Sequence, residues 1–204
     1  MTRCLSCRAN VTSLSIISVI EQHMRQYTVT RAWEMSTYGA TLRYLKQHVH
    51  AVVTSEYYPD HSPGAMVGHV LNQDVQQLTF DDASLDLITS NQVFEHVPDD
   101  VQGYGECYRV LRSNGALIFT VPLADDPTTF RLAEIVNGRI MFHAAPEYHD
   151  SRITGPHSVL AFWRHSRIDI CNRVAQVGFR TQLVDVILSS SQRVPAKVIY
   201  AIKP

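Results

Sequence analysis

Three acidic side chains stand at or just after short apolar segments, where a folded chain can present them to a ligand. Glu34 ends "TRAWE", Glu56 ends "HAVVTSE", and Asp74 follows "HVLNQ". Glu56 lies 22 residues after Glu34, and an acidic residue at such a position can accept hydrogen bonds from the hydroxyls of a ribose. The carboxylate of Asp74 can accept a hydrogen bond from the exocyclic amine of an adenine, while the backbone N–H of Val75 donates one to a ring nitrogen. Each acid alone is also consistent with a solvated surface or turn residue.

The loop after the first of these segments reads Glu-Met-Ser-Thr-Tyr-Gly from Glu34 to Gly39. A nucleotide-binding turn between a strand and a helix usually has several glycines, because glycine lets the chain turn sharply and lets a ligand approach the backbone. Only Gly39 remains here. Ser36 and Thr37 are small enough to replace glycines at negative φ, whereas Tyr38 would be costly at positive φ.

The order of apolar segments predicts the elements that position these side chains. Helical spacing and start signals predict helices at residues 13–24, 38–48 and about 98–112, and short apolar runs predict strands at about 29–35, 50–58, 69–75, 84–93 and 116–123. Residues 59–68 contain two prolines and two glycines and are predicted to form a loop. Alternating strands and helices indicate an α/β doubly wound sheet, in which ligands bind at the carboxyl ends of the strands.

The C-terminal part of the chain departs from this alternation. Residues 124–176 are predicted to form a helical insertion on the acceptor side of the site, and they contain His143, His149, His157 and His165. Two strand-like runs follow within residues 177–204, separated by "SSSQRVP", which leaves no room for a crossover helix. We therefore expect a terminal antiparallel hairpin. The whole chain, 1–204, is expected to be one domain, with 1–28 as an N-terminal segment and helix and 29–123 as the ligand-binding half.

Composition excludes several classes of protein. The chain has 204 residues, with 18 Lys plus Arg against 19 Asp plus Glu and a pI near 6.8, so it lacks the basic excess that binds nucleic acid. The apolar run at residues 11–20 is broken by serines and a threonine, is too short to span a bilayer and has no cleavage signature. Four cysteines form no disulfide framework. We expect a cytoplasmic protein without a membrane or nucleic-acid partner.

The segments "NQDVQQLTFDDASLDLITSNQVFEHVPD" and "ECYRVLRSNGALIFTVPL" resemble the class I S-adenosylmethionine-dependent methyltransferases, especially those in which the fourth strand leads into a Glu-His-Val turn. The resemblance runs from about residue 29 to residue 123 and continues weakly through the terminal hairpin. It implies a mostly parallel seven-stranded sheet in a three-layer sandwich, ending in an antiparallel hairpin. Leu85 stands where the family usually has Phe, and Asn114 where it has a first glycine. The first loop departs most, because the family usually has Gly-x-Gly-x-Gly there.

The resemblance also implies roles for individual residues around the cofactor S-adenosylmethionine. Glu34 and Gly39 would lie beside the methionine moiety, and Glu56 would bind the ribose. Asp74 and the backbone of Val75 would frame the adenine. Asn91 and Gln92, just past the fourth strand, would lie near the sulfonium and the methyl group.

The expected methyl acceptor is a small molecule or a carbohydrate-like compound. His96 is the nearest candidate for a general base, although the favoured interpretation is that it fixes the turn before the helix start at Pro98. The four later histidines, with Glu147, Tyr148 and Asp150, could line an acceptor pocket. Their spacings match no metal motif. Cys4 and Cys7 form half of a zinc knuckle or a redox pair, and no metal site is predicted.

Three functions remain to be distinguished. The first is a methyltransferase that uses S-adenosylmethionine. The second is a methyltransferase-like module that binds without turnover, which the glycine-poor loop suggests. The third, a nicotinamide oxidoreductase, is disfavoured by the terminal hairpin, because the sheet of such enzymes is usually parallel throughout.

Overall fold

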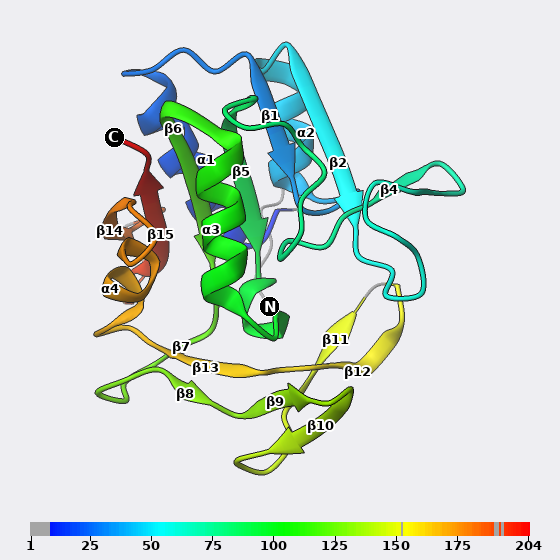
Figure 1. Cartoon of the computed structure of the whole chain (residues 1–204). Coiled ribbons are helices and arrows are strands. Elements are labelled where there is room, and N and C mark those ends of the chain that lie inside the picture. Colours follow the sequence, from blue (N-terminus) through cyan, green and yellow to red (C-terminus); the bar gives the residue numbers. More distant parts are fainter. Residues whose placement is uncertain (1–8, 152, 190–191, 193) are drawn as a thin grey trace.

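A central sheet of eight strands forms the body of the molecule (Figure 1). The computed structural model describes residues 9–151, 153–189, 192 and 194–204, so Cys4 and Cys7 lie outside the described residues. In spatial order the strands are β14 (Arg180–Val186), β15 (Ala196–Ile202), β6 (Leu111–Thr120), β5 (Leu85–Asn91), β1 (Arg31–Glu34), β2 (Ala51–Glu56), β4 (Val70–Asn72) and β3 (Met66–Val67).

The strands of the middle of the sheet are parallel, from β6 through β5, β1 and β2 to β4. Strand β15 is antiparallel to both β6 and β14, which confirms the terminal hairpin. The two-residue strand β3 pairs antiparallel with β4 and adds one strand to the expected seven. No helix stands between β2 and β4, as predicted, but the loop predicted at residues 59–68 is wrong at Met66–Val67, which form β3.

Both faces of the sheet are buried, since apolar side chains alternate between two cores. Along β6, Leu117 and Phe119 pack into the core beneath α3 (Asp100–Val110) and α4 (Ile170–Ala175), whereas Ile118 packs into the core beneath α1 (Val11–Met24) and α2 (Ala40–His48). Figure 1 shows α3 in front of the sheet and α1 behind it. This arrangement explains the nearly continuous apolar run of the strand. None of the helices in the described part of the chain is long and apolar enough to cross a membrane.

The helical prediction for residues 124–176 is wrong. The segment forms short strands, and α4 is the one α-helix among its described residues. The strands are β7 (Leu123–Ala124), β8 (Phe130–Arg131), β9 (Ala133–Val136), β10 (Arg139–Phe142), β11 (Tyr148–Ser151), β12 (Gly155–Leu160) and β13 (Trp163–Ser166). The reason is local: Asn137 and Gly138 have φ of 50° and 73°, as in the two-residue turn that joins β-hairpin strands. This Asn-Gly pair was the sequence signal for the hairpin.

A buried ionic cluster ties the insertion to helix α3. Asp100 is fully buried, and its carboxylate accepts hydrogen bonds from His165 Nε2 at 3.0 Å and from Arg173 Nε at 2.7 Å. The Arg173 guanidinium lies over the ring of Trp163, 4.1 Å from its centre. Burial alone would raise the pKa of Asp100, but the hydrogen bonds from His165 and Arg173 hold it below its ordinary value. One acid of α3 thereby fixes both β13 and α4.

Candidate cofactor site

A cavity of about 400 Å³ opens at the carboxyl ends of β1, β2, β4 and β5. Its opposite wall comes from the β11–β12 hairpin, which includes Asp150, Ser151, Ser158 and Val159. Figure 1 shows these strand ends directed toward the insertion. The volume lies in the range of about 300–1,000 Å³ that is usual for small-molecule sites, and the position is the one expected for a ligand of a doubly wound sheet.

Glu56, at the end of β2, lines the cavity and holds the first loop in place. Its Oε1 accepts hydrogen bonds from the backbone N–H of Thr37 at 2.8 Å and from the Thr37 hydroxyl at 2.6 Å. The second oxygen of the carboxylate, Oε2, takes part in neither bond. Glu56 can therefore order the loop with one oxygen and accept from a ligand hydroxyl with the other.

Glu34 and Gly39 are not among the residues that line the cavity. Glu34 is buried below the loop, where Thr89 and Ser36 donate hydrogen bonds to its carboxyl group. Burial raises the pKa of Glu34 to about 7. Gly39 starts helix α2 at φ 112°. Both residues shape the loop from behind, while Ser36 and Tyr38 form its cavity side.

The loop closes with a single residue at positive φ. Gly39 is that residue, and Ser36, Thr37 and Tyr38 all have negative φ. A side chain at negative φ carries little backbone strain. The loop is therefore built without the further glycines that such turns usually contain.

Asp74 and Val75 follow β4 and line the cavity together. Asp74 Oδ1 accepts from the backbone N–H of Gln76 at 2.9 Å and from its side-chain amide at 3.2 Å. The first of these bonds makes an Asx turn. The turn and ligand-binding interpretations of Asp74 are thus compatible, because the turn presents the same carboxylate to the cavity.

Asn91 and Gln92 also line the cavity, at the end of β5. The Thr120 hydroxyl donates to Asn91 Oδ1 at 2.9 Å, and the Gln92 backbone N–H donates to the Thr120 carbonyl at 2.9 Å. Gln92 has a φ of 58°, a left-handed conformation that is strained for a non-glycine residue. Strain of this kind is concentrated at functional sites, where the surroundings hold it.

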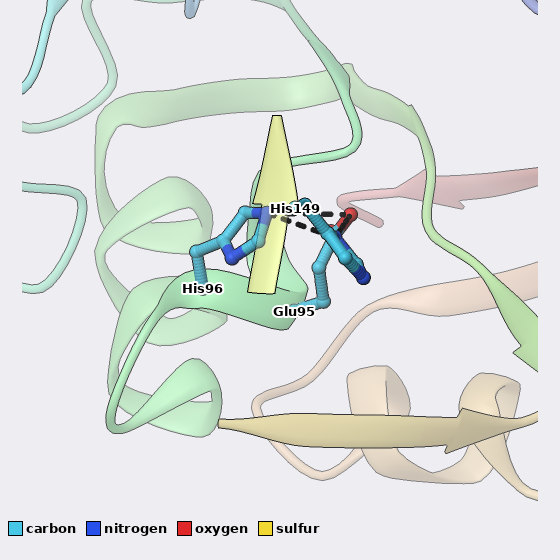
Figure 2. A group of neighbouring side chains, drawn as sticks. All are labelled: Glu95, His96 and His149. Carbon is cyan, nitrogen blue, oxygen red and sulfur yellow. Dashed lines mark hydrogen bonds and ion pairs between the residues drawn. The ribbon is translucent and has the colours of Figure 1, made fainter. Parts of the chain in front are cut away.

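His96 lines the cavity, and Figure 2 shows its side chain beside that of Glu95, which is buried. Its Nδ1 lies 2.8 Å from the Leu160 carbonyl, which can only accept, so Nδ1 carries the proton and Nε2 is the acceptor. Nε2 lies 3.2 Å from His149 Nδ1 and 3.8 Å from Glu95 Oε1. Burial lowers the pKa of His96 to about 4 and raises that of Glu95 to about 8.

The other residues proposed for an acceptor pocket are dispersed. His143 pairs with Glu134, and His165 is buried against Asp100. Glu147 pairs with Arg164, while His157 and Tyr148 are exposed. Asp150 is the residue of this group that lines the cavity, and His149 is the one that contacts His96. The sequence did not mark Glu95, although its adjacency to His96 in "FEHVPD" was a signal.

Comparison with known proteins agrees with this geometry. Residues 36–119 match the family model described as a methyltransferase domain. A probable S-adenosylmethionine-dependent methyltransferase of Mycolicibacterium smegmatis is 41% identical over 46 residues, which cover 22% of this chain and 18% of that protein.

Solved structures share the fold at low sequence identity. An S-adenosylmethionine-dependent methyltransferase from Mesorhizobium loti superposes with a TM-score of 0.58 at 13% identity, covering 90% of this chain and 96% of that one. The Burkholderia thailandensis 1,6-didemethyltoxoflavin-N1-methyltransferase, with bound 1,6-didemethyltoxoflavin and S-adenosylhomocysteine, gives 0.59 at 14% identity, covering 95% of this chain and 78% of that one. Residues 36–119 therefore match a methyltransferase domain, as the motifs predicted, and the chain has the fold of the class I S-adenosylmethionine-dependent methyltransferases, whose cofactor is S-adenosylmethionine.

Proposed function

We propose that this protein transfers a methyl group from S-adenosylmethionine to a small-molecule acceptor held between the strand ends and the β11–β12 hairpin. The observation that carries the proposal is the convergence of Glu56, Asp74, Val75, Asn91 and Gln92 on one cavity. These residues come from three strand ends that lie apart in the sequence. The small-molecule acceptor of the Burkholderia enzyme supports the acceptor class.

The reaction needs alignment more than it needs acid or base chemistry. A lone pair of the acceptor attacks the methyl carbon, the carbon–sulfur bond breaks, and its electron pair stays on sulfur as a thioether. Because the donor is already activated, holding the two reactants in line supplies much of the acceleration. Glu56 would bind the ribose hydroxyls, and Asp74 with the Val75 N–H would bind the adenine edge. Asn91 and Gln92 would border the sulfonium.

The roles of Glu34 and Gly39 are indirect in this proposal. Glu34 accepts a hydrogen bond from the Ser36 hydroxyl, and Gly39 makes the turn into α2. They would set the position of the loop that receives the methionine tail. A module without turnover has no further support, since the loop forms without strain at Ser36, Thr37 and Tyr38.

Isothermal titration with S-adenosylmethionine and S-adenosylhomocysteine tests the proposal. Glu56→Ala and Asp74→Ala should each weaken binding about 10-fold or more, since a lost hydrogen bond to a charged group costs about 1.5–3 kcal/mol. Asp185→Ala is the matched control, because Asp185 is an exposed acid on β14 outside the cavity. No binding by the unaltered protein at millimolar ligand, or equal binding by all three variants, would refute the proposal.

A further inference from the structure

Three potential metal ligands from two separate parts of the chain converge beside the cavity (Figure 2). Glu95 and His96 lie on the short 3₁₀ helix Phe94–His96, and His149 lies on β11. His96 Nε2 and His149 Nδ1 are 3.2 Å apart, and each lies 3.8 Å from Glu95 Oε1. Because 53 residues separate the two histidines, no sequence motif marks the group.

Within this group of three residues, the burial of the Glu95 carboxyl group needs an explanation. Its side chain is 1% exposed, and neither carboxyl oxygen has a hydrogen-bond partner among the described residues. A buried carboxyl group without a hydrogen-bond donor is costly, and in native structures the large majority of buried polar side-chain atoms have a partner, so this group needs one such as an ion. The oxygen Oε1 faces the two imidazole nitrogens, so a cation between them would supply the missing partner.

The orientation of His96 is also that of a metal ligand. Its Nδ1–H donates to the Leu160 carbonyl, which leaves the Nε2 lone pair directed at His149 and Glu95. Ligand histidines commonly donate their second ring nitrogen to a backbone carbonyl in this way. The contact fixes both the tautomer and the ring.

The distances suit a tetrahedral ion. Metal–ligand bonds of about 2.0–2.1 Å in a tetrahedral site place neighbouring ligand atoms about 3.3–3.4 Å apart. The observed separations are 3.2, 3.8 and 3.8 Å. If the three ligand atoms moved by a few tenths of an ångström, they would have the separations needed to coordinate one ion.

We propose that Glu95, His96 and His149 bind one divalent transition-metal ion of the zinc type, with an open coordination position toward the cavity. Two imidazoles and one carboxylate are a usual donor set for a zinc site with an open position. The proposal makes His96 a ligand in place of the general base considered from the sequence.

The open position would receive a hydroxyl oxygen of the acceptor, a step that rests on the proposed function. A bound ion lowers the pKa of a coordinated O–H group, so the proton leaves to solvent and the oxygen becomes the nucleophile. The oxygen then forms the new bond to the methyl carbon while the carbon–sulfur pair goes to sulfur. The inferred acceptor class is therefore a hydroxyl compound.

Titration of chelator-treated protein with Zn²⁺, and with Co²⁺ as a spectroscopic probe, tests the site. We expect one tight site per chain, with affinity reduced at least 10-fold in Glu95→Gln and in His149→Ala. His157→Ala is the matched control, since His157 is an exposed histidine of the same hairpin. Every titration is repeated in a Cys4→Ser/Cys7→Ser background, because that cysteine pair could itself bind zinc.

Two readouts separate the possible failures. Equal Zn²⁺ affinity in wild type, Glu95→Gln and His149→Ala would overturn the metal site, and circular dichroism verifies that the variants are folded. S-adenosylmethionine binding by the metal-free protein is measured in parallel, so it tests the proposed function independently. Azide should change the absorption of the Co²⁺ form, and an unchanged spectrum would overturn the open position.

Discussion

Replacing Asp100 should be among the most destabilising single changes in this chain. Its carboxylate is fully buried and is bonded by Arg173 through Nε at 2.7 Å and Nη2 at 2.5 Å, and by His165 at 3.0 Å. Asp100→Ala would leave the largely buried Arg173 guanidinium without its counter-ion. Breaking a buried pair in this way costs about 3–5 kcal/mol.

Urea unfolding followed by circular dichroism measures this loss. Asp185→Ala serves as the control, because it removes an exposed ion pair with Lys197 and should cost less than about 1 kcal/mol. The double variant Asp100→Ala/Arg173→Met should recover part of the loss, since it leaves no unpaired charge. If Asp100→Ala and Asp185→Ala lower the free energy of unfolding equally, the ionic cluster does not stabilise the insertion as described.

Three further predictions concern pH, packing and strain. The pKa of Glu34 is about 7 in the folded protein, against an ordinary value of 4.5. The protonated carboxyl group therefore stabilises the fold fully below pH 4.5, and this stabilisation is lost as the pH rises through about 7. The lost stabilisation amounts to about 3 kcal/mol. Glu34→Gln should therefore make the free energy of unfolding, measured by urea unfolding between pH 4.5 and 8, depend less on pH. An unchanged pH dependence would contradict the raised pKa of Glu34. Gly115→Ala should destabilise by about 1–3 kcal/mol, because its Cβ would lie 2.9 Å from the Arg112 carbonyl oxygen. Gly105→Ala on helix α3 would place a Cβ at an ordinary contact distance of 3.9 Å from Val177 Cγ1, so it should instead stabilise by up to about 1 kcal/mol. The reverse order of melting temperatures for the two variants would refute this reasoning. Gln92→Gly should raise the free energy of unfolding by about 1 kcal/mol by relieving positive φ, while titration should show weaker cofactor binding; unchanged stability would argue against strain.

The sheet could be predicted because its signal is local. Runs such as "ALIFTVPL" are apolar on both faces, so they indicate buried parallel strands without any knowledge of their neighbours. The terminal hairpin was equally clear, because "SSSQRVP" is too short for a crossover. The end of a strand can be located once the strand is predicted, so the sequence could place Glu56, Asp74 and Asn91 at one edge of the sheet, where they line the cavity.

The insertion and the histidine cluster could not be predicted in the same way. Residues 124–176 were assigned as helical although Asn137-Gly138 marks a hairpin turn, so a local signal was missed there. His149 lies close to His96 only because the β11–β12 hairpin packs against the cavity. Such tertiary contacts leave no periodicity in the chain. For the same reason the burial of Glu95 was not evident from its sequence neighbours.

The charge of the cavity wall has a consequence for turnover. Glu56, Asp74 and Asp150 line the cavity, and none of the described lining residues is a lysine or arginine. A unit positive charge about 10 Å from one carboxylate gains about 1–2 kcal/mol at an effective dielectric constant near 20. The sulfonium of the cofactor carries such a charge, and the thioether product does not. Methyl transfer would thus remove part of the electrostatic attraction between the cavity wall and the bound nucleoside. We therefore expect the demethylated product of the cofactor to bind more weakly, and to dissociate faster, than S-adenosylmethionine itself.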